Sequence, residues 1–487
     1  MQKRVTDYVL YRWRYALSYL FIAGVIGLVL FVASIYVPGA LRAGETTASL
    51  KSGALSIEAL SPHMVIDLPY HILQRFSFML FGVTTLSIKL PSILLGIVTV
   101  FGIFLLVRTW FRRNIAILVT LLAATSTQFL FLVQDGTPNI MFSFLTVWLL
   151  FAATYVTRNK TFGTFWKVLT GVLMATALYS PLGIYLVLAV LTTTFFHPHI
   201  RYVILHFSRP RLWIGVLLGL ASLVPLFYAA FVDPTTLMIL AGLPTTDPDL
   251  SKNMTDIVLN LFGFAASSTS YLLRPAYSLG LTLLMLVGIY KLVTYKYTAR
   301  SYITLTLGLF MVPLVLLNPE HVYALFPLAC LMIALGIATL ITDWYKLFPR
   351  NPYARVAGLL PLGVLILGIV YSGITRYMGN YTYNPAIMSH YSHDLSLLAS
   401  QLQSTPAKQQ PVALVVGKDE AAFYGLVAHY DKRFAIAGTD STHSSPVTMV
   451  SHAAHAEYTA AKEPTAIITN SMSQASDRFY IYKTVAK

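Results

Sequence analysis

The feature that most constrains this chain is a series of long apolar segments separated by short clusters of charged residues. A segment of about 20 apolar residues crosses the hydrocarbon core of a bilayer as a helix. We expect eleven such spans, so the predicted fold class is an α-helical polytopic membrane protein. The expected spans cover residues 16–38, 87–107, 115–133, 140–157, 167–180, 181–196, 212–232, 277–294, 302–317, 322–342 and 356–375.

The composition excludes a soluble enzyme. Only 11% of the residues are charged, whereas an ordinary soluble domain carries roughly 25%. The single cysteine, Cys330, lies in an apolar segment and has no disulfide partner, so we expect a small buried side chain. The net charge of +15 does not indicate nucleic-acid binding, because the basic residues cluster between the spans.

The distribution of the basic residues predicts the orientation. Before residue 377, nineteen lysines and arginines fall in the loops of one side and seven on the other. The positive-inside rule then predicts a cytoplasmic N-terminus and an extracytoplasmic C-terminus in the plasma membrane. The first span is longer than a signal-peptide core, so we expect a retained anchor.

The carboxylates show the opposite distribution, which predicts where the chemistry takes place. Before the tail, only Asp7 and Asp343 are expected on the cytoplasmic side, whereas nine acidic residues lie in or beside external loops. The long external segments are residues 39–86 and 233–276 and the tail. We therefore expect a transmembrane domain at 1–376, an extracytoplasmic domain at 377–487 and a site on the outer face.

The tail differs in pattern from the rest of the chain. Five segments have the length and β-branched content of strands, and two between them have helical spacing. A small α/β domain is expected, without a phosphate-binding glycine motif and without catalytic groups. The strand segments are PVALVVG, RFAIAG, PVTMVS, TAIITN and RFYIYKTV, and the helical segments are DEAAFYGLVAHY and HAAHAEYTAAK.

The order of motifs from Gly44 to Phe151 resembles a known family. An acid, Glu45, follows the first span in RAGETTAS, and the next segment reads LPYHILQRFSFMLFGVTTLSIKLPSILLG, which predicts a surface helix and then a span. QDGTPN follows the third span. This order is similar to that of the GT-C superfamily of integral-membrane glycosyltransferases, in the branch of protein O-mannosyltransferases and the lipid A aminoarabinose transferase.

The resemblance implies transfer of a sugar from a polyprenyl-phosphate donor to an acceptor on the outer face, with inversion. The resemblance does not specify the acceptor, which is a lipid, a protein or a cell-wall glycan. Two positions depart from the family pattern. Gly44 stands where the family usually has the Asp of an Asp-Glu pair, and EHVYALFPLA stands where it often has an Arg-Tyr sequence.

Two carboxylates are the candidate catalytic residues. An inverting displacement needs a carboxylate that takes the acceptor proton, together with donors that hold the leaving phosphate. Glu45 is the first choice for the base and Asp135 the second. The structural alternatives are a hydrated loop carboxylate for Glu45 and a turn or cap within QDGTPN for Asp135. We expect both acids to emerge at the same membrane depth and to meet in one cavity.

The candidate substrate-binding residues are external cations and their neighbours. Arg274 precedes the eighth span, where a guanidinium either grips a phosphate or reaches lipid headgroups. Glu320 and His321 share a short external turn, and two such residues are too few to define a metal site. The sequence therefore leaves open whether the protein uses a divalent cation, and it identifies no cofactor. The full set of predicted contacts is Arg42, Tyr70, Arg75, Arg274, Glu320 and His321.

Two other classes of function fit a chain with many spans. A transporter or flippase of lipid-linked saccharides would need charges inside the membrane or paired broken helices. A non-catalytic envelope assembly protein would need no acids aligned at the ends of the first and third spans. The expected partners in the catalytic interpretation are the lipid-linked donor, the acceptor and membrane lipids, and no nucleic acid.

Overall fold

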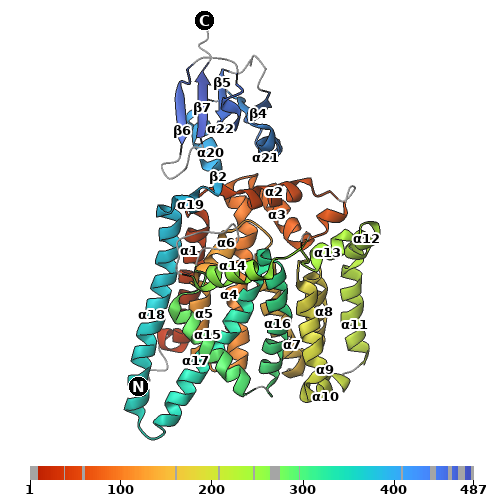
Figure 1. Cartoon of the computed structure of the whole chain (residues 1–487), viewed down its shortest axis with the longest axis vertical. Coiled ribbons are helices and arrows are strands. Elements are labelled where there is room, and N and C mark those ends of the chain that lie inside the picture. Colours follow the sequence, from red (N-terminus) through yellow and green to blue (C-terminus); the bar gives the residue numbers. More distant parts are fainter. Residues whose placement is uncertain are drawn as a thin grey trace.

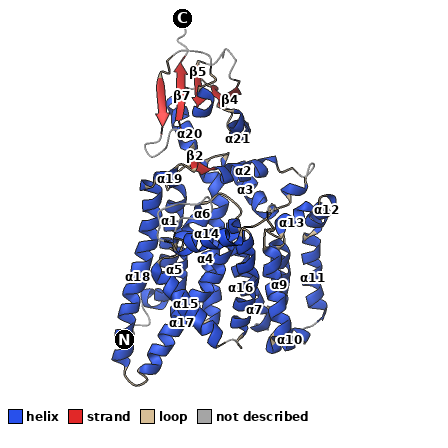
Figure 2. Ribbon diagram, viewed as in Figure 1, coloured by secondary structure: helices blue, strands red, loops and turns tan. Residues whose placement is uncertain are grey.

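Long helices form an elongated bundle, and a small unit that contains the main β-sheet lies at one end of it (Figures 1 and 2). This computed structural model describes residues 9–37, 39–56, 61–158, 162–206, 209–244, 247–263, 275–295, 297–406, 410–438, 446–458, 463–469 and 478–483.

Each of the eleven predicted apolar segments lies on helix. The prediction of a mainly helical, multi-pass architecture is therefore confirmed at this coarse level. The helices of the bundle are α1 (Val9–Ile35), α4 (Thr85–Trp110), α5 (Arg113–Ala124), α6 (Thr127–Gln134), α7 (Ile140–Arg158), α8 (Gly163–Ala177), α9 (Gly183–Phe196), α10 (Pro198–Leu205), α11 (Arg209–Ser222), α12 (Val224–Val232), α15 (Leu279–Thr294), α16 (Ala299–Leu317), α17 (Phe326–Leu347) and α18 (Pro352–Tyr383).

The number of membrane spans stays a prediction. In the described part of the chain, five helices are long and apolar enough to cross a membrane, or up to eight if each bent pair counts as one span. The bends are 61° between α5 and α6, 90° between α9 and α10, and 45° between α11 and α12. Helix-start signals lie at two of them: Ser126 is the N-cap residue of α6, and Pro198 is the first residue of α10.

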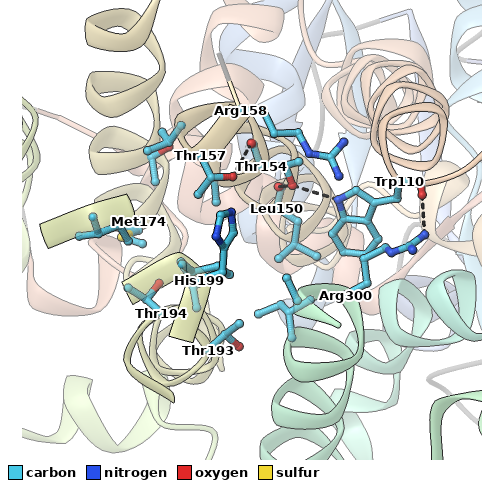
Figure 3. A pocket seen from close by; sticks show the side chains of 18 residues that line it. Trp110, Leu150, Thr154, Thr157, Arg158, Met174, Thr193, Thr194, His199 and Arg300 are labelled. Atoms are coloured by element: carbon cyan, nitrogen blue, oxygen red, sulfur yellow. Dashed lines mark hydrogen bonds between the residues drawn. The ribbon is translucent and has the colours of Figure 1, made fainter. Parts of the chain in front are cut away.

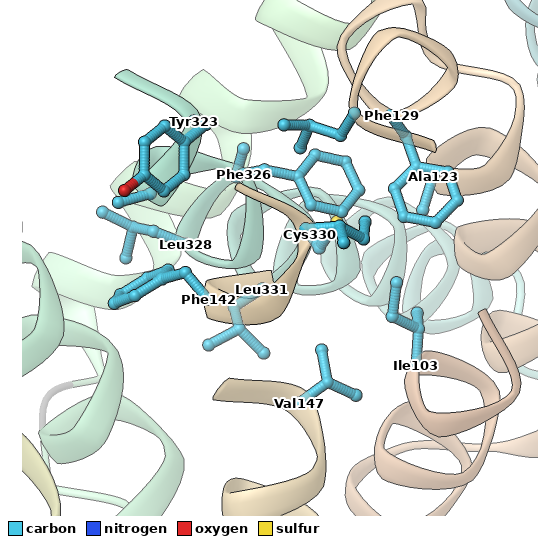
Figure 4. Packing of buried hydrophobic residues seen from close by; sticks show 14 of the residues in the cluster. Ile103, Ala123, Phe129, Phe142, Val147, Tyr323, Phe326, Leu328, Cys330 and Leu331 are labelled. Carbon is cyan, nitrogen blue, oxygen red and sulfur yellow. The ribbon is translucent and has the colours of Figure 1, made fainter. Parts of the chain in front are cut away.

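The core of the bundle surrounds the first half of α17. The rings of Phe129 and Phe326 stack with their centroids 5.1 Å apart, and Phe142 packs edge-on to Tyr323 (Figure 4). Cys330 is buried in this cluster, which confirms the expectation of a small apolar side chain.

Helices α15 and α17 approach each other through glycines. A Cβ built on Gly288 would lie 2.0 Å from the carbonyl oxygen of Met332, and one on Gly336 would lie 2.1 Å from that of Leu284. Small residues at such crossings let two backbones come into contact inside a membrane. The spacing of this helix pair therefore depends on the absence of two side chains.

Short helices cover the end of the bundle near the sheet. The predicted surface helix is present as α3 (Leu68–Phe81), which buries Gln74 and Phe78 and exposes Phe76 and Met79. A second helix here, α2, was not predicted. The elements of this layer are α2 (Ala43–Ala54), the 3₁₀ helices η2 (Pro62–Met64) and η3 (Pro319–Leu325), α3, α13 (Thr235–Leu240) and α14 (Leu250–Phe262).

The C-terminal part contains the predicted α/β structure. All five predicted strands are confirmed, and they form one sheet in the order β4-β3-β5-β7-β6, with β3 parallel to β4 and β5 and β7 antiparallel to its neighbours. Of the second predicted helix, the described residues 452–458 show a single turn, α22, and the remainder lies outside the described residues. The elements are β3 (Val412–Val415), β4 (Phe434–Ala437), β5 (Val447–Ser451), β6 (Ala466–Thr469), β7 (Arg478–Lys483), α19 (Pro385–Met388), α20 (Leu395–Ser404), α21 (Lys418–Tyr430) and α22 (His452–His455).

The chain joins this unit to the bundle in two ways. Strand β2 (Tyr391–His393) pairs antiparallel with β1 (Leu41–Arg42) at the end of the first helix. Helix α21 also packs on the layer below it, where the rings of Phe78 and Tyr430 lie 6.2 Å apart. Because α18 continues to Tyr383, the expected boundary near residue 376 lies inside a helix, and the division into two domains stays a prediction.

The glycine contact between α15 and α17 gives a first prediction. Gly336→Ala should destabilise the protein by about 1–3 kcal/mol, because the added methyl group forces two backbones apart. Gly308→Ala in α16 is the matched control, since its Cβ would meet only Leu328 side-chain atoms at 3.7 Å or more. Thermal unfolding in detergent measures both variants. Equal stability of the two would contradict the packing argument.

Candidate active site

Arg42 connects the elements of the site. It lies in the short strand β1 and is also the N-cap residue of α2. Its Nη2 donates hydrogen bonds to both carboxylate oxygens of Asp135, each at 2.8 Å, and its guanidinium lies over the ring of Phe131, 5.3 Å from the centroid. The end of the first helix is thereby attached to the loop after α6.

Glu45 lies in the first turn of α2, where the helix itself positions it. Its Oε2 accepts a hydrogen bond from the backbone N–H of Arg42 at 2.7 Å, as in a capping box. Its Oε1 accepts one from the N–H of Gly136 at 2.8 Å. Lys89 Nζ lies 3.7 Å from the same oxygen. Glu45 is therefore a fully buried helix residue, and not the hydrated loop carboxylate that was the structural alternative.

Asp135 ends α6 and begins the loop that leads into α7. Besides Arg42, its Oδ2 accepts hydrogen bonds from Thr137 Oγ1 at 2.6 Å and from Asn139 Nδ2 at 3.4 Å. The expected turn chemistry is thus present, and an ion pair is added to it. Since Arg42 contacts Asp135 and Gly136 contacts Glu45, the two predicted acids meet although about ninety residues separate them.

A polar cluster extends the site toward the C-terminal unit. Lys89 Nζ donates to Gln134 Oε1 at 3.3 Å and to the carbonyl oxygen of Ala40 at 3.4 Å. Gln134 Nε2 in turn donates to the hydroxyls of Tyr381 at 3.2 Å and Tyr391 at 3.0 Å. Tyr381 and Tyr391, which both follow residue 376, therefore belong to this cluster, and the absence of catalytic groups from the tail stays a prediction.

Burial and charge compensation decide the electrostatics. Burial raises the pKa of Glu45, and Lys89 opposes that shift. For Arg42, burial alone would lower the pKa, but the neighbouring carboxylates, Asp135 foremost, raise it overall. Two carboxylates and two cations thus share a region from which water is almost excluded, and isolated charges would not be stable there.

The other predicted contacts fall at different distances from this centre. Tyr70 is buried, and its hydroxyl lies 2.8 Å from Ser92 Oγ, which donates to the carbonyl oxygen of Thr137 at 3.3 Å. Arg75 instead donates to the carbonyl oxygen of Gly53 at 3.4 Å, so it is directed toward α2. Arg274 lies outside the described residues.

A cavity of about 220 Å³ begins next to the loop that follows Asp135, but neither Asp135 nor Glu45 is among its lining residues, so the two acids do not meet in this cavity. Asn139, which donates to Asp135, lines it together with Glu320 and His321. Asp67 lines the same cavity in a left-handed backbone conformation with φ of 55°. Burial raises the pKa of Asp67 to about 7. The cavity is therefore rich in groups that donate or accept hydrogen bonds.

Several residues of the site were not identified as such from the sequence. The site residues predicted from the sequence do not include Lys89, Asp67, Gln134, Tyr381 or Tyr391. A lysine inside an apolar segment was the one signal that indicated a buried partner. Within the described residues, no group of three or more His, Cys, Asp or Glu side chains could hold a metal ion.

Known proteins resemble the chain in sequence and in fold. The family of dolichyl-phosphate-mannose-protein mannosyltransferases matches residues 69–228, and comparison with curated sequences gives no match. Among solved structures, the oligosaccharyltransferase AglB from Archaeoglobus fulgidus, in complex with an inhibitory peptide and a dolichol-phosphate, has a TM-score of 0.50 at 13% identity. ArnT from Cupriavidus metallidurans in the apo state has a TM-score of 0.50 at 15% identity.

The extent of these matches differs. The alignment with AglB covers 86% of this chain and 64% of AglB, so the chain spans less than two thirds of that protein. The alignment with ArnT covers 96% of this chain and 98% of ArnT.

The chain has the GT-C fold. The resemblance seen in the motifs is therefore confirmed. Of the site residues, Lys89 and Asp135 lie within the matched family range, whereas Arg42, Glu45 and Tyr391 lie outside it. The site thus combines the matched segment with segments on either side of it.

The buried pair of Lys89 and Glu45 gives the second prediction. Lys89→Met leaves a buried carboxylate without its cation and should cost about 3–5 kcal/mol of unfolding free energy. Adding Glu45→Gln removes the charge, so the double variant should be more stable than Lys89→Met alone. Lys346→Met is the control, because its partner Asp343 is exposed and such pairs contribute about 1 kcal/mol or less. A double variant no more stable than the single one would contradict this account.

Proposed function

We propose that this protein transfers a sugar from a polyprenyl-phosphate donor to an acceptor at the membrane face that carries Glu45 and Asp135. The proposed orientation is the one predicted from the basic residues, with this face outside the cytoplasm and the protein in the plasma membrane. The acceptor class is a lipid, a protein or a cell-wall glycan. The matched family and the GT-C fold support the use of a lipid-linked donor.

One observation carries the proposal. Two carboxylates from separate helices meet at one end of a GT-C bundle, beside a polar cavity. A purely structural pair of acids would not need such a cavity next to it. Asp67, a carboxyl group whose pKa is raised by burial, lines this cavity, and such groups in a cleft are typical of functional sites.

The contacts support different roles for the two acids. Both oxygens of Glu45 accept backbone hydrogen bonds, and one also faces Lys89, which suits a group that holds α2 and the loop after α6 in place. Asp135 accepts hydrogen bonds from Arg42 and Thr137, and it also contacts Asn139, which is one of the residues that line the cavity. We therefore assign Asp135 as the general base and Glu45 as the residue that positions it.

The cavity suits the hydroxyl groups of a sugar. Asp67, Asn139 and Tyr323 each offer a hydrogen-bonding group to it, and a few such groups in a small cleft are what sugar recognition requires. A buried carboxyl with a pKa near 7 exists partly as the neutral acid, which donates a hydrogen bond. In this arrangement His321 and Glu320 contact the substrate from the opposite wall.

The leaving phosphate needs positive charge that other groups do not neutralise. The positive charges of Arg42 and Lys89 already compensate the negative charges of Asp135 and Glu45. These two cations therefore act on the phosphate only through the net electrostatic field of the four side chains. Arg274 keeps its proposed role as a phosphate ligand on the strength of its position in the sequence. Arg75 is another cation on this face, and its side chain donates a hydrogen bond to the carbonyl oxygen of Gly53 in α2.

The third prediction tests this function with purified protein in detergent. Mannosyl-phosphoryl-polyprenol is the donor, and release of free polyprenyl phosphate is measured. General-base catalysis contributes about 10²–10⁴-fold, so Asp135→Asn should lower turnover by that factor. Glu45→Gln should lower it less and should also lower the thermal stability. Asp431→Asn in the C-terminal unit, which removes a surface pair with Arg433, is the control and should keep full turnover.

Two results would contradict the proposal. Wild-type turnover in Asp135→Asn would exclude it as the base. Movement of intact lipid-linked sugar across proteoliposomes without release of polyprenyl phosphate, for this donor and for others that differ in the sugar, would favour the transporter alternative. A non-catalytic assembly protein would neither release polyprenyl phosphate nor move the lipid-linked sugar across the membrane.

The fourth prediction concerns the buried carboxyl of Asp67. Its pKa is about 7 in the folded protein and near 3.8 without burial. The folded state therefore binds the proton more tightly, and stability falls as pH rises through this range, by about 1.4 kcal/mol per pH unit, and levels off above pH 7. Asp67→Asn should lack this fall. Thermal unfolding of both proteins at pH 5, 6, 7 and 8 measures the difference.

An exposed acid provides the control for this pH series. Asp249 caps α14 at an exposed position, so Asp249→Asn should shift stability by the same amount at each pH. Parallel curves for the wild type and Asp67→Asn would contradict the shifted pKa.

A further inference from the structure

Two cavities flank the end of α4 that lies far from the acidic site. The first, of about 310 Å³, lies between α7, α8, α9, α10 and α16, and the second, of about 450 Å³, lies between α15, α16 and α17. Trp110 and Arg300 line both of them. The function proposed above uses neither cavity.

Two arginines converge on the last carbonyl groups of α4. Arg158 Nη1 donates to the carbonyl oxygen of Thr109 at 2.7 Å, and Arg300 Nη1 donates to that of Trp110 at 2.5 Å. Figure 3 shows both guanidinium groups beside the Trp110 ring at the first cavity. Each guanidinium has five N–H donors, and the contact with the helix end uses one, so further donors can bind an anion.

The positive charge at this place is not compensated by the residues that line the cavities. No aspartate or glutamate is among the lining residues of either cavity, whereas Arg112 and Lys291 add further cations at the second cavity. A helix C-terminus carries only about half of an elementary negative charge. The partial negative charge at the C-terminus of α4 therefore offsets only part of the positive charge of one arginine. The positive charges of Arg158 and Arg300 also repel each other.

The walls of the first cavity indicate what kind of anion fits. Apolar side chains such as Leu150, Met174 and Ile204 line it together with threonine hydroxyls. Helix α10, which forms one wall, bends by 90° away from α9 and leaves Tyr202 and Leu205 largely exposed. A short helix of this kind lies along a membrane surface. The cavity thus offers cations at its rim and apolar surface toward the lipid.

We propose that the first cavity binds the phosphate headgroup of an anionic membrane phospholipid, with Arg158 and Arg300 as the phosphate ligands. Basic pockets between membrane helices bind such headgroups through paired charges and hydrogen bonds. The acyl chains follow the apolar walls. Free inorganic phosphate offers the same anionic oxygens, but it would gain nothing from these walls.

Native mass spectrometry of the full-length protein tests the proposal. The detergent-purified protein is mixed with equal amounts of dioleoyl-phosphatidylglycerol and dioleoyl-phosphatidylcholine, and the lipid that stays bound is identified. We expect one phosphatidylglycerol to be retained in preference to phosphatidylcholine. A tenfold excess of inorganic phosphate over the lipid should not displace it.

A pair of variants isolates the charge without disturbing the arginines at the helix end. Thr157 lines the cavity, so Thr157→Glu adds a carboxylate that competes for the guanidinium groups. It should weaken phosphatidylglycerol binding by about tenfold or more. Thr157→Gln has the same size and no charge, and it should bind as the wild type does. Arg350→Gln removes an exposed cation that is not among the lining residues, and it should also bind normally.

Three results would overturn the proposal. Equal retention of both lipids by the wild type would exclude a headgroup site for anions. Unchanged binding in Thr157→Glu would place the bound lipid elsewhere. Displacement by inorganic phosphate at a concentration near that of the lipid would make the ligand a soluble anion.

Discussion

The ion pair between Arg42 and Asp135 is the interaction on which the arrangement of the site depends. Arg42 is set in place by strand β1 and by its role at the start of α2, so its side chain reaches the loop after α6. Glu45 and Lys89 form a second buried pair beside it. Buried charges persist only when each has a partner. The four side chains therefore determine how α2, α4 and the loop before α7 lie relative to one another.

The same cluster links the membrane bundle to the C-terminal unit. Tyr391 follows α19 and pairs with β1, and its hydroxyl accepts a hydrogen bond from Gln134 next to Asp135. The tail is thus more than an appended domain, because one of its strands completes the shell around the acids. The proposed chemistry needs this rigidity, since a base is useful only when it is held at a fixed position.

Sequence patterns predicted the regular parts of this structure well. The apolar segments and the five strands followed from length and periodicity, because these signals reflect burial in lipid or in a sheet. The helix α2 was missed, since its sequence AGETTASLKSGA is rich in glycine, serine and threonine. The bends at Ser126, inside the expected span 115–133, and at Leu223, inside the expected span 212–232, were also missed, so the number of spans could not be read from hydropathy alone.

The site was predicted only in part. The proximity of Glu45 and Asp135 followed from the expected membrane depth of both acids. The ion pairs that these acids form with Arg42 and Lys89 could not be predicted in the same way. They depend on the contact between β1 and β2 and on the inward direction of α4 side chains. Such contacts join residues up to about 350 positions apart, and no local pattern encodes them.

A double-mutant cycle between Arg42 and Asp135 tests the central claim most directly. The free energy of unfolding is measured for the wild type, Arg42→Gln, Asp135→Asn and the double variant in the same detergent. We predict that each single variant is destabilised and that the double variant is less destabilised than the sum, with a coupling energy of about 1–3 kcal/mol. Additive effects of the two substitutions would show that this pair does not organise the site.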